Sequence, residues 1–166
     1  MSYLRFGAMI AASTLIMFVL MYLNTYAFDH VLFSQTRAYM ALVMGAAMAI
    51  VMLLFMFGMY PNKGMNLAII AGSMVVFAAA LWMVRSQTGV GDVAYMKAMT
   101  PHHSIAIMTS ERAHIRDPRV RALADEILAA QVREIEEMKA LIDDLEENPP
   151  PSQAPILAPR RPPAGG

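Results

Sequence analysis

Three long runs without a charged residue dominate the first half of the chain. They cover Phe6–Phe28, Ala38–Asn62 and Gly64–Val84. Each is longer than the roughly 18 apolar residues that identify a helix able to cross a bilayer. The first run exceeds the core of a cleaved signal peptide, and two more runs follow it. We therefore predict three transmembrane helices, at about residues 5–26, 38–60 and 65–84.

Short polar segments connect these runs. One loop contains Asp29 and ends near Arg37, and residues 60–64 form a tight turn. Aromatic residues that fit the two membrane interfaces are Tyr3, Tyr60, Tyr22, Tyr26, Tyr39 and Trp82. Three spans place the two termini on opposite sides of the membrane. The basic residues are divided between both sides and leave the orientation open, and we favour a cytoplasmic amino terminus.

The second half of the chain is polar and is predicted to contain two more helices. We expect the first at residues 91–116 and a highly charged second one at 118–147. Asp117-Pro118 separates them, because Asp is a good N-cap and Pro is favoured in the first helical turn. The tail that follows is rich in proline and lacks periodicity, so we predict it to be disordered.

These elements predict an all-α fold. Its expected domains are a membrane domain at residues 1–85, an antiparallel two-helix hairpin at 86–147 and the proline-rich tail at 148–166.

The composition excludes several functional classes. The chain has 13 Lys and Arg against 13 Asp and Glu, so its net charge gives no electrostatic basis for nucleic-acid binding. It has no cysteine, which excludes disulfides, thiolate zinc sites and thiol nucleophiles. No nucleophile–base pair is visible, and we predict no enzymatic activity. Methionine is unusually frequent, with 17 residues.

Histidine and methionine side chains gather in the predicted hairpin. At about 100° per residue, one broad face of the first helix carries Asp92, Met96, Met99, His103, Ile107, Ser110 and His114. His102 lies beside that face. If the second helix folds back antiparallel, its residues 131–138 lie opposite. The side chains then expected at one level are Met96, Met99, His102, His103, Gln131, Glu134 and Met138.

Such a set of side chains favours copper. Thioether sulfur and imidazole nitrogen suit Cu(I) better than Mg²⁺ or Ca²⁺, and zinc sites usually use thiolate, imidazole and carboxylate. Glu134 or Gln131 would bind the metal or orient an imidazole. Pro101 is expected to kink the helix, which would help His102 and His103 to reach one site. The alternative is an ordinary core, since methionine at helical spacing is usually packing.

The order of residues across both helices resembles the DUF305 family over about residues 90–146. The matching positions are Asp92, Met99, His102, His103, Met108, Gln131, Glu134 and Met138. Tyr95 stands where the family usually has Phe, and Met96 where it usually has Leu. The resemblance implies a ferritin-like fold. It also implies a copper site, because some members are periplasmic copper-binding proteins implicated in copper resistance.

Three further patterns allow other interpretations. Glu111 and His114 have the Glu-x-x-His spacing of di-iron bundles, although in a single copy near a helix end. Met108 lies off the His103 face and would equally serve packing. Five methionines recur at every fourth position of the second span: Met40, Met44, Met48, Met52 and Met56. They favour close helix packing, with a thioether path for Cu(I) as the alternative.

We therefore expect a membrane-anchored protein that binds copper, as Cu(I) or Cu(II), for sequestration, sensing or hand-over. The expected partners are membrane lipid and a second copy, because one hairpin buries little and two complete a four-helix bundle. The resemblance implies a multi-pass protein of the cytoplasmic (inner) membrane with its carboxy-terminal domain on the periplasmic side. The alternative is a structural or accessory subunit of a membrane complex with no metal role.

Overall fold

The computed structural model describes residues 2–151 and 153–160, and all regular secondary structure within them is helical. This confirms the predicted all-α class. The five α-helices are α1 (Tyr3–Leu20), α2 (Gln35–Phe55), α3 (Lys63–Ser86), α4 (Asp92–Arg112) and α5 (Pro118–Glu147). Two short 3₁₀ helices, η1 (Phe28–His30) and η2 (Phe57–Met59), flank α2.

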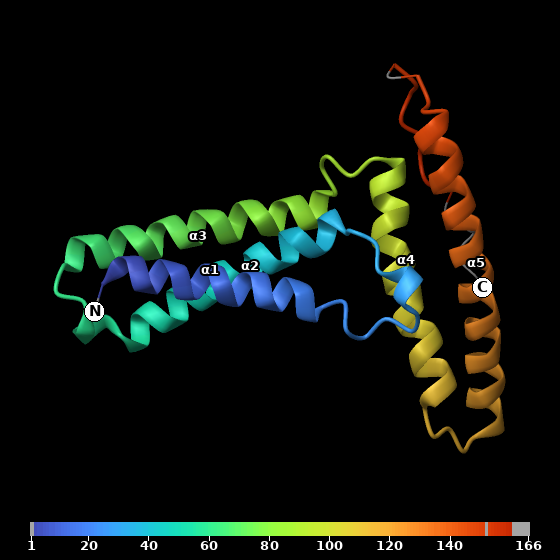
Figure 1. The fold of residues 1–166 in the computed structure, drawn as a ribbon, viewed down its shortest axis with the longest axis horizontal. Helices are drawn as coiled ribbons and strands as arrows, with labels where there is room; N and C mark the ends of the chain where they lie inside the picture. The colour runs from blue at the N-terminus through green and yellow to red at the C-terminus, as the bar shows by residue number, and fades with distance from the viewer. Residues whose placement is uncertain (1, 152, 161–166) are drawn as a thin grey trace.

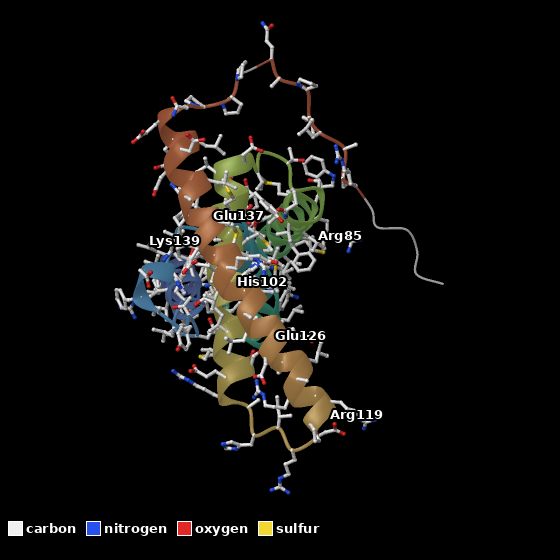
Figure 2. The ribbon with its side chains drawn as sticks, turned by 90° about the vertical axis from the view of Figure 1, so that its right-hand side faces the viewer. Arg85, His102, Arg119, Glu126, Glu137 and Lys139 are labelled. Carbon is white, nitrogen blue, oxygen red and sulfur yellow. The ribbon has the colours of Figure 1, made fainter. Side chains whose placement is uncertain are left out.

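Helices α1, α2 and α3 lie side by side, and α4 and α5 lie across one end of them (Figure 1). Figure 2 looks onto that end, with α5 in front. The first three helices have mean hydropathies of 1.8, 2.3 and 2.4 and are long and apolar enough to cross a membrane. The three predicted spans are confirmed in this sense, and they indicate a membrane protein.

The ends of these helices differ from the predicted ones for local reasons. Helix α1 ends at Leu20 rather than near residue 26, because the following segment forms a loop that packs on α4. Helix α2 begins earlier than predicted, since the side chain of Ser34 caps it by accepting the Arg37 N–H at 3.2 Å. It ends at Phe55, so Met56 lies just beyond the four methionines that α2 carries.

Polar residues fix the far end of the membrane helices. Asn66 of α3 is fully buried, and its amide nitrogen donates to the Tyr60 carbonyl at 3.2 Å. The Tyr3 hydroxyl of α1 donates to the Asn66 side-chain oxygen at 2.7 Å. A small apolar core of Phe6, Leu53 and Tyr60 packs around this contact. The turn between α2 and α3 is thereby tied to the start of α1.

Helices α4 and α5 pack side by side and run in opposite directions (Figure 1). As predicted, Asp117 is the N-cap of α5: its carboxylate accepts the Arg119 N–H at 2.8 Å, and Pro118 follows it. Helix α4 continues through Pro101 and ends at Arg112, before the predicted residue 116. The described part of the tail, residues 148–151 and 153–160, contains no helix or strand, and residues 152 and 161–166 lie outside the described residues.

The loop between α1 and α2 is held against α4. The fully buried Ser104 hydroxyl accepts the Tyr26 backbone N–H at 2.7 Å and contacts Nδ1 of His30 at 2.9 Å. Lys139 of α5 forms an ion pair with Asp29 in the same loop. These contacts attach the hairpin to the membrane domain independently of the chain that connects α3 to α4.

Acidification is expected to loosen this attachment. Burial lowers the pKa of His30 below its ordinary 6.5, with Asp29 opposing the change and Lys139 adding to it. Because the folded pKa lies below the unfolded one, the attachment is complete above about pH 6.5 and weakens as the pH falls through the lowered pKa. We expect amide hydrogen-exchange protection of residues 26–31 to fall several-fold between about pH 7.5 and about pH 5. His30→Asn should remove this dependence and His114→Asn should retain it, whereas constant protection would contradict it.

Candidate metal centre

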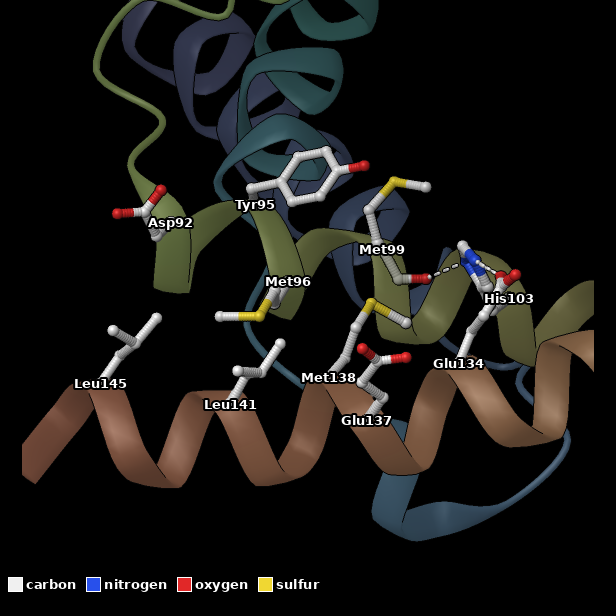
Figure 3. A pocket seen from close by; sticks show the side chains of 10 residues that line it. All are labelled: Asp92, Tyr95, Met96, Met99, His103, Glu134, Glu137, Met138, Leu141 and Leu145. Carbon is white, nitrogen blue, oxygen red and sulfur yellow. Dashed lines mark hydrogen bonds and ion pairs between the residues drawn. The ribbon is translucent and has the colours of Figure 1, made fainter. Parts of the chain in front are cut away.

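A groove of about 440 Å³ runs between α4 and α5. It is lined mainly by residues from one side of each helix, spaced three or four apart. The lining residues are Asp92, Tyr95, Met96, Met99, His103, Glu134, Glu137, Met138, Leu141 and Leu145 (Figure 3). Five of the seven principal predicted site residues lie here, together with Asp92 from the less certain group. Four of the seven residues on the predicted helical face, Asp92, Met96, Met99 and His103, thus line the groove, and Ile107, Ser110 and His114 do not.

The polar centre of the groove is the pair formed by His103 and Glu134. Nε2 of His103 lies 2.9 Å from a carboxylate oxygen of Glu134, and Nδ1 lies 3.0 Å from the Met99 backbone oxygen. A carbonyl oxygen only accepts, so Nδ1 carries a hydrogen. Nε2 and the carboxylate oxygen are at hydrogen-bonding distance, so a metal ion that bound at Nε2 would displace this contact.

Three methionines line the same groove. Met96 is buried, whereas Met99 and Met138 are partly exposed. Figure 3 shows Met138 between Met96 and the His103–Glu134 pair, while the side chain of Met99 extends away from α5. Methionine is unbranched and changes rotamer readily, so Met99 can adapt to a ligand in the groove.

The structure places the other predicted site residues elsewhere. His102 is exposed and lines a neighbouring pocket, because successive residues of a helix point about 100° apart. Its ring centroid is 6.2 Å from that of His103. Gln131 and Met108 are partly buried and do not line the groove. His114 is exposed beyond the end of α4, so Glu111 and His114 do not share a helix as the di-iron spacing requires.

Sequence reasoning missed four residues of the groove. Tyr95 and Glu137 line it, as do Leu141 and Leu145. Leu141 and Leu145 continue the spacing that begins at Glu134 and Met138, so the helical repeat of α5 could have identified them. Among the described residues, no group of three His, Cys, Asp or Glu side chains is placed to hold a metal ion.

The region that forms the groove matches a known family model. The model is described as "Domain of unknown function (DUF305)" and matches residues 92–161. The resemblance predicted from the sequence is thus confirmed by a family-model match, and the matched region contains both α4 and α5.

A viral protein shares part of the sequence. "Uncharacterized protein L153" of Acanthamoeba polyphaga mimivirus is 32% identical to this chain over 74 residues, which are 43% of this chain and 49% of the viral protein. The chain thus spans about half the length of that relative. No solved structure matches the chain. Neither the DUF305 description nor the name of the relative states a function.

Proposed function

We propose that the protein is a membrane-anchored copper-binding protein whose DUF305 domain holds Cu(I) in the groove between α4 and α5. The observation that carries this proposal is that one groove is lined by three methionines, Met96, Met99 and Met138, together with the His103–Glu134 pair. Among biological metals, Cu(I) is the one that a combination of thioether and imidazole ligands favours most.

The surroundings of His103 support a ligand role. Its Nδ1–H donates to the Met99 carbonyl, which holds the ring so that Nε2 faces Glu134 in the groove. A fixed ring with one nitrogen directed inward is the arrangement that metal-binding histidines commonly have. Glu134 then acts either as a further ligand or as the acceptor that aligns the ring. Metal binding at Nε2 would replace the contact with Glu134.

The alternatives with harder ligands fit the groove less well. Zinc sites are commonly built from thiolate, imidazole and carboxylate, and the chain has no cysteine. Mg²⁺ and Ca²⁺ require several oxygen ligands. The acidic residues Asp92, Glu134 and Glu137 line the same groove but do not form a three-ligand cluster with one another or with His103.

Location and assembly belong to this proposal. Copper handling is chiefly a task of the cell envelope, so we place α4 and α5 on the periplasmic side of the cytoplasmic membrane. A reporter fused to Gly166 would test this, and reporter activity on the cytoplasmic side would contradict it.

We further propose a homodimer through the hairpin. Val120, Leu123 and Ile127 of α5 are exposed, and exposed apolar residues without a partner favour association.

The thioether contribution can be tested with two matched triple variants. Met96→Leu/Met99→Leu/Met138→Leu should lower the Cu(I) affinity of the full-length protein by about 100-fold or more, because leucine keeps the volume and removes sulfur. Competition against a Cu(I) chelator measures the affinity. The control variant Met40→Leu/Met44→Leu/Met48→Leu removes three sulfurs from α2 and should leave the affinity unchanged.

Two results would contradict the proposal. If the hairpin variant binds Cu(I) as tightly as the unaltered protein, the groove methionines are packing residues. That outcome would favour a structural or accessory role in a membrane complex. If the α2 variant instead loses binding, the metal site lies along the membrane helix rather than in the groove.

A further inference from the structure

We propose that a second pocket, next to the groove but separate from the copper site, binds the phosphate of an anionic phospholipid. This pocket has a volume of about 300 Å³ and meets the groove at Tyr95 and Met99, which line both. The remaining lining residues come from three parts of the chain: Ser34, Thr36, Arg37, Gln87, Ala98 and His102. Of the proposed copper ligands, only Met99 lines this second pocket, where it forms part of the wall shared with the groove.

The position of the pocket is at the membrane boundary. Ser34 and Thr36 lie at the start of α2, and Gln87 is the C-cap of α3, so the pocket sits where the membrane helices meet α4. Trp82 precedes Gln87 by little more than one helical turn and is 61% exposed. Exposed tryptophan near the end of an apolar helix is typical of the headgroup layer. The pocket therefore opens at the depth where lipid phosphates lie.

Arg37 provides the positive charge. It is held in place by a hydrogen bond from Nη1 to the Met21 carbonyl and by the ring of Tyr22, whose centroid is 4.5 Å from the guanidinium carbon. No carboxylate pairs with Arg37 in the part of the chain that the structure describes, and none lines the pocket. A fixed guanidinium without a counter-charge at a membrane boundary suits a phosphate, to which it can donate two parallel hydrogen bonds.

Neutral donors complete the site. The Thr36 hydroxyl lines the pocket, and the first backbone N–H groups of α2 lie at the same end of that helix. His102 also lines the pocket, and no hydrogen bond or ion pair of its imidazole is found within the described residues. This assignment gives His102 a role distinct from that of His103, which faces the groove.

The location at the membrane favours a lipid headgroup, rather than free phosphate, as the source of the bound phosphate group. Arg37 belongs to the first turn of a helix that is apolar enough to span the bilayer, so its charge lies next to the lipid headgroups at all times. A headgroup with net negative charge supplies the missing counter-charge, whereas a zwitterionic headgroup brings its own cation. We therefore assign the site to an anionic phospholipid such as phosphatidylglycerol.

Lipid titration of the delipidated, full-length protein in detergent, followed by native mass spectrometry, tests the assignment. We expect one phosphatidylglycerol to bind at least about 10-fold more tightly than phosphatidylcholine. Arg37→Gln should remove that preference, Arg37→Lys should retain part of it, and His102→Ala should weaken binding about 2- to 5-fold. His103→Ala should leave lipid binding unchanged, which separates this site from the copper site.

Three results would overturn the assignment. Equal binding of both lipids would show that the pocket does not select an anionic headgroup. Unaltered preference in both Arg37→Gln and His102→Ala would place the lipid elsewhere, and His102 is exposed, so its variant should fold normally. Displacement of phosphatidylglycerol by millimolar inorganic phosphate would identify free phosphate as the ligand. None of these outcomes depends on whether the groove binds copper.

Discussion

Replacing His103 by Ala is expected to lower the Cu(I) affinity of the full-length protein by about 100-fold or more, whereas His102→Ala should change it by less than about 3-fold. The two residues are adjacent and of the same type, so they form a matched pair. Their difference arises from geometry: Nε2 of His103 lies in the groove against Glu134, and His102 lines the neighbouring pocket. Chelator competition at constant pH measures both variants.

Glu134→Gln tests the same site and is expected to have a smaller effect on Cu(I) affinity than His103→Ala. Glu134→Gln keeps the size of the side chain and a hydrogen-bonding oxygen but removes the charge. If the carboxylate only orients His103, the affinity should fall by about 10-fold. Equal losses for His102→Ala and His103→Ala would contradict the proposed site, because they would mean that both rings bind one ion. No loss in His103→Ala would exclude the groove as the site.

Gly45→Ala is expected to destabilise the membrane domain by about 1–3 kcal/mol, the usual cost of forcing extra volume into a packed interface. A Cβ at Gly45 of α2 would lie 2.3 Å from the Thr14 side-chain oxygen and 3.1 Å from its methyl group. Threonine is branched at Cβ and cannot turn aside freely, and its hydroxyl donates to the Ile10 carbonyl at 2.8 Å. Helix α1 would have to move away from α2.

Two variants control for other effects of the added methyl group. Gly72→Ala on α3 places a Cβ where nothing lies within 4 Å, so it should leave the stability nearly unchanged. Thr14→Ala removes the atoms that clash and should restore most of the stability when combined with Gly45→Ala. Thermal unfolding in detergent measures all four proteins. If Gly45→Ala and Gly72→Ala behave alike, α1 and α2 do not pack as closely as described.

Much of the helical pattern could be predicted from the sequence, because its signals are strong and local. Uncharged runs predict the three apolar helices, and Asp117-Pro118 predicts the start of α5. The 100° repeat placed Met96, His103 and Glu134 on facing surfaces, where the structure also has them. These predictions required only the properties of single helices or of one short turn.

Features that depend on long-range contacts escaped prediction. The sequence predicts helix through residue 26, because these apolar residues read as part of the span, whereas Tyr26 contacts Ser104, 78 positions away in the chain. A kink at Pro101 is expected to bring His102 and His103 to one site. Helix α4 instead continues through Pro101, and the 100° step between successive residues gives the two rings different surroundings.

The attachment of the loop at Ser104 has a mechanical consequence. Residues 87–91 are the only covalent connection between α3 and α4, and alone they would let α4 and α5 rotate relative to the first three helices. The contacts of Ser104 with Tyr26 and His30 are a second attachment that restricts this rotation. Ser104 directly follows His103 in α4, so the anchor and the groove side chain share one rigid turn. Any rotation of α4 that repositions the His103 ring also pulls on the loop, and through it on α1 and α2. The contacts at Ser104 thus link the turn of α4 that carries His103 to the loop between α1 and α2.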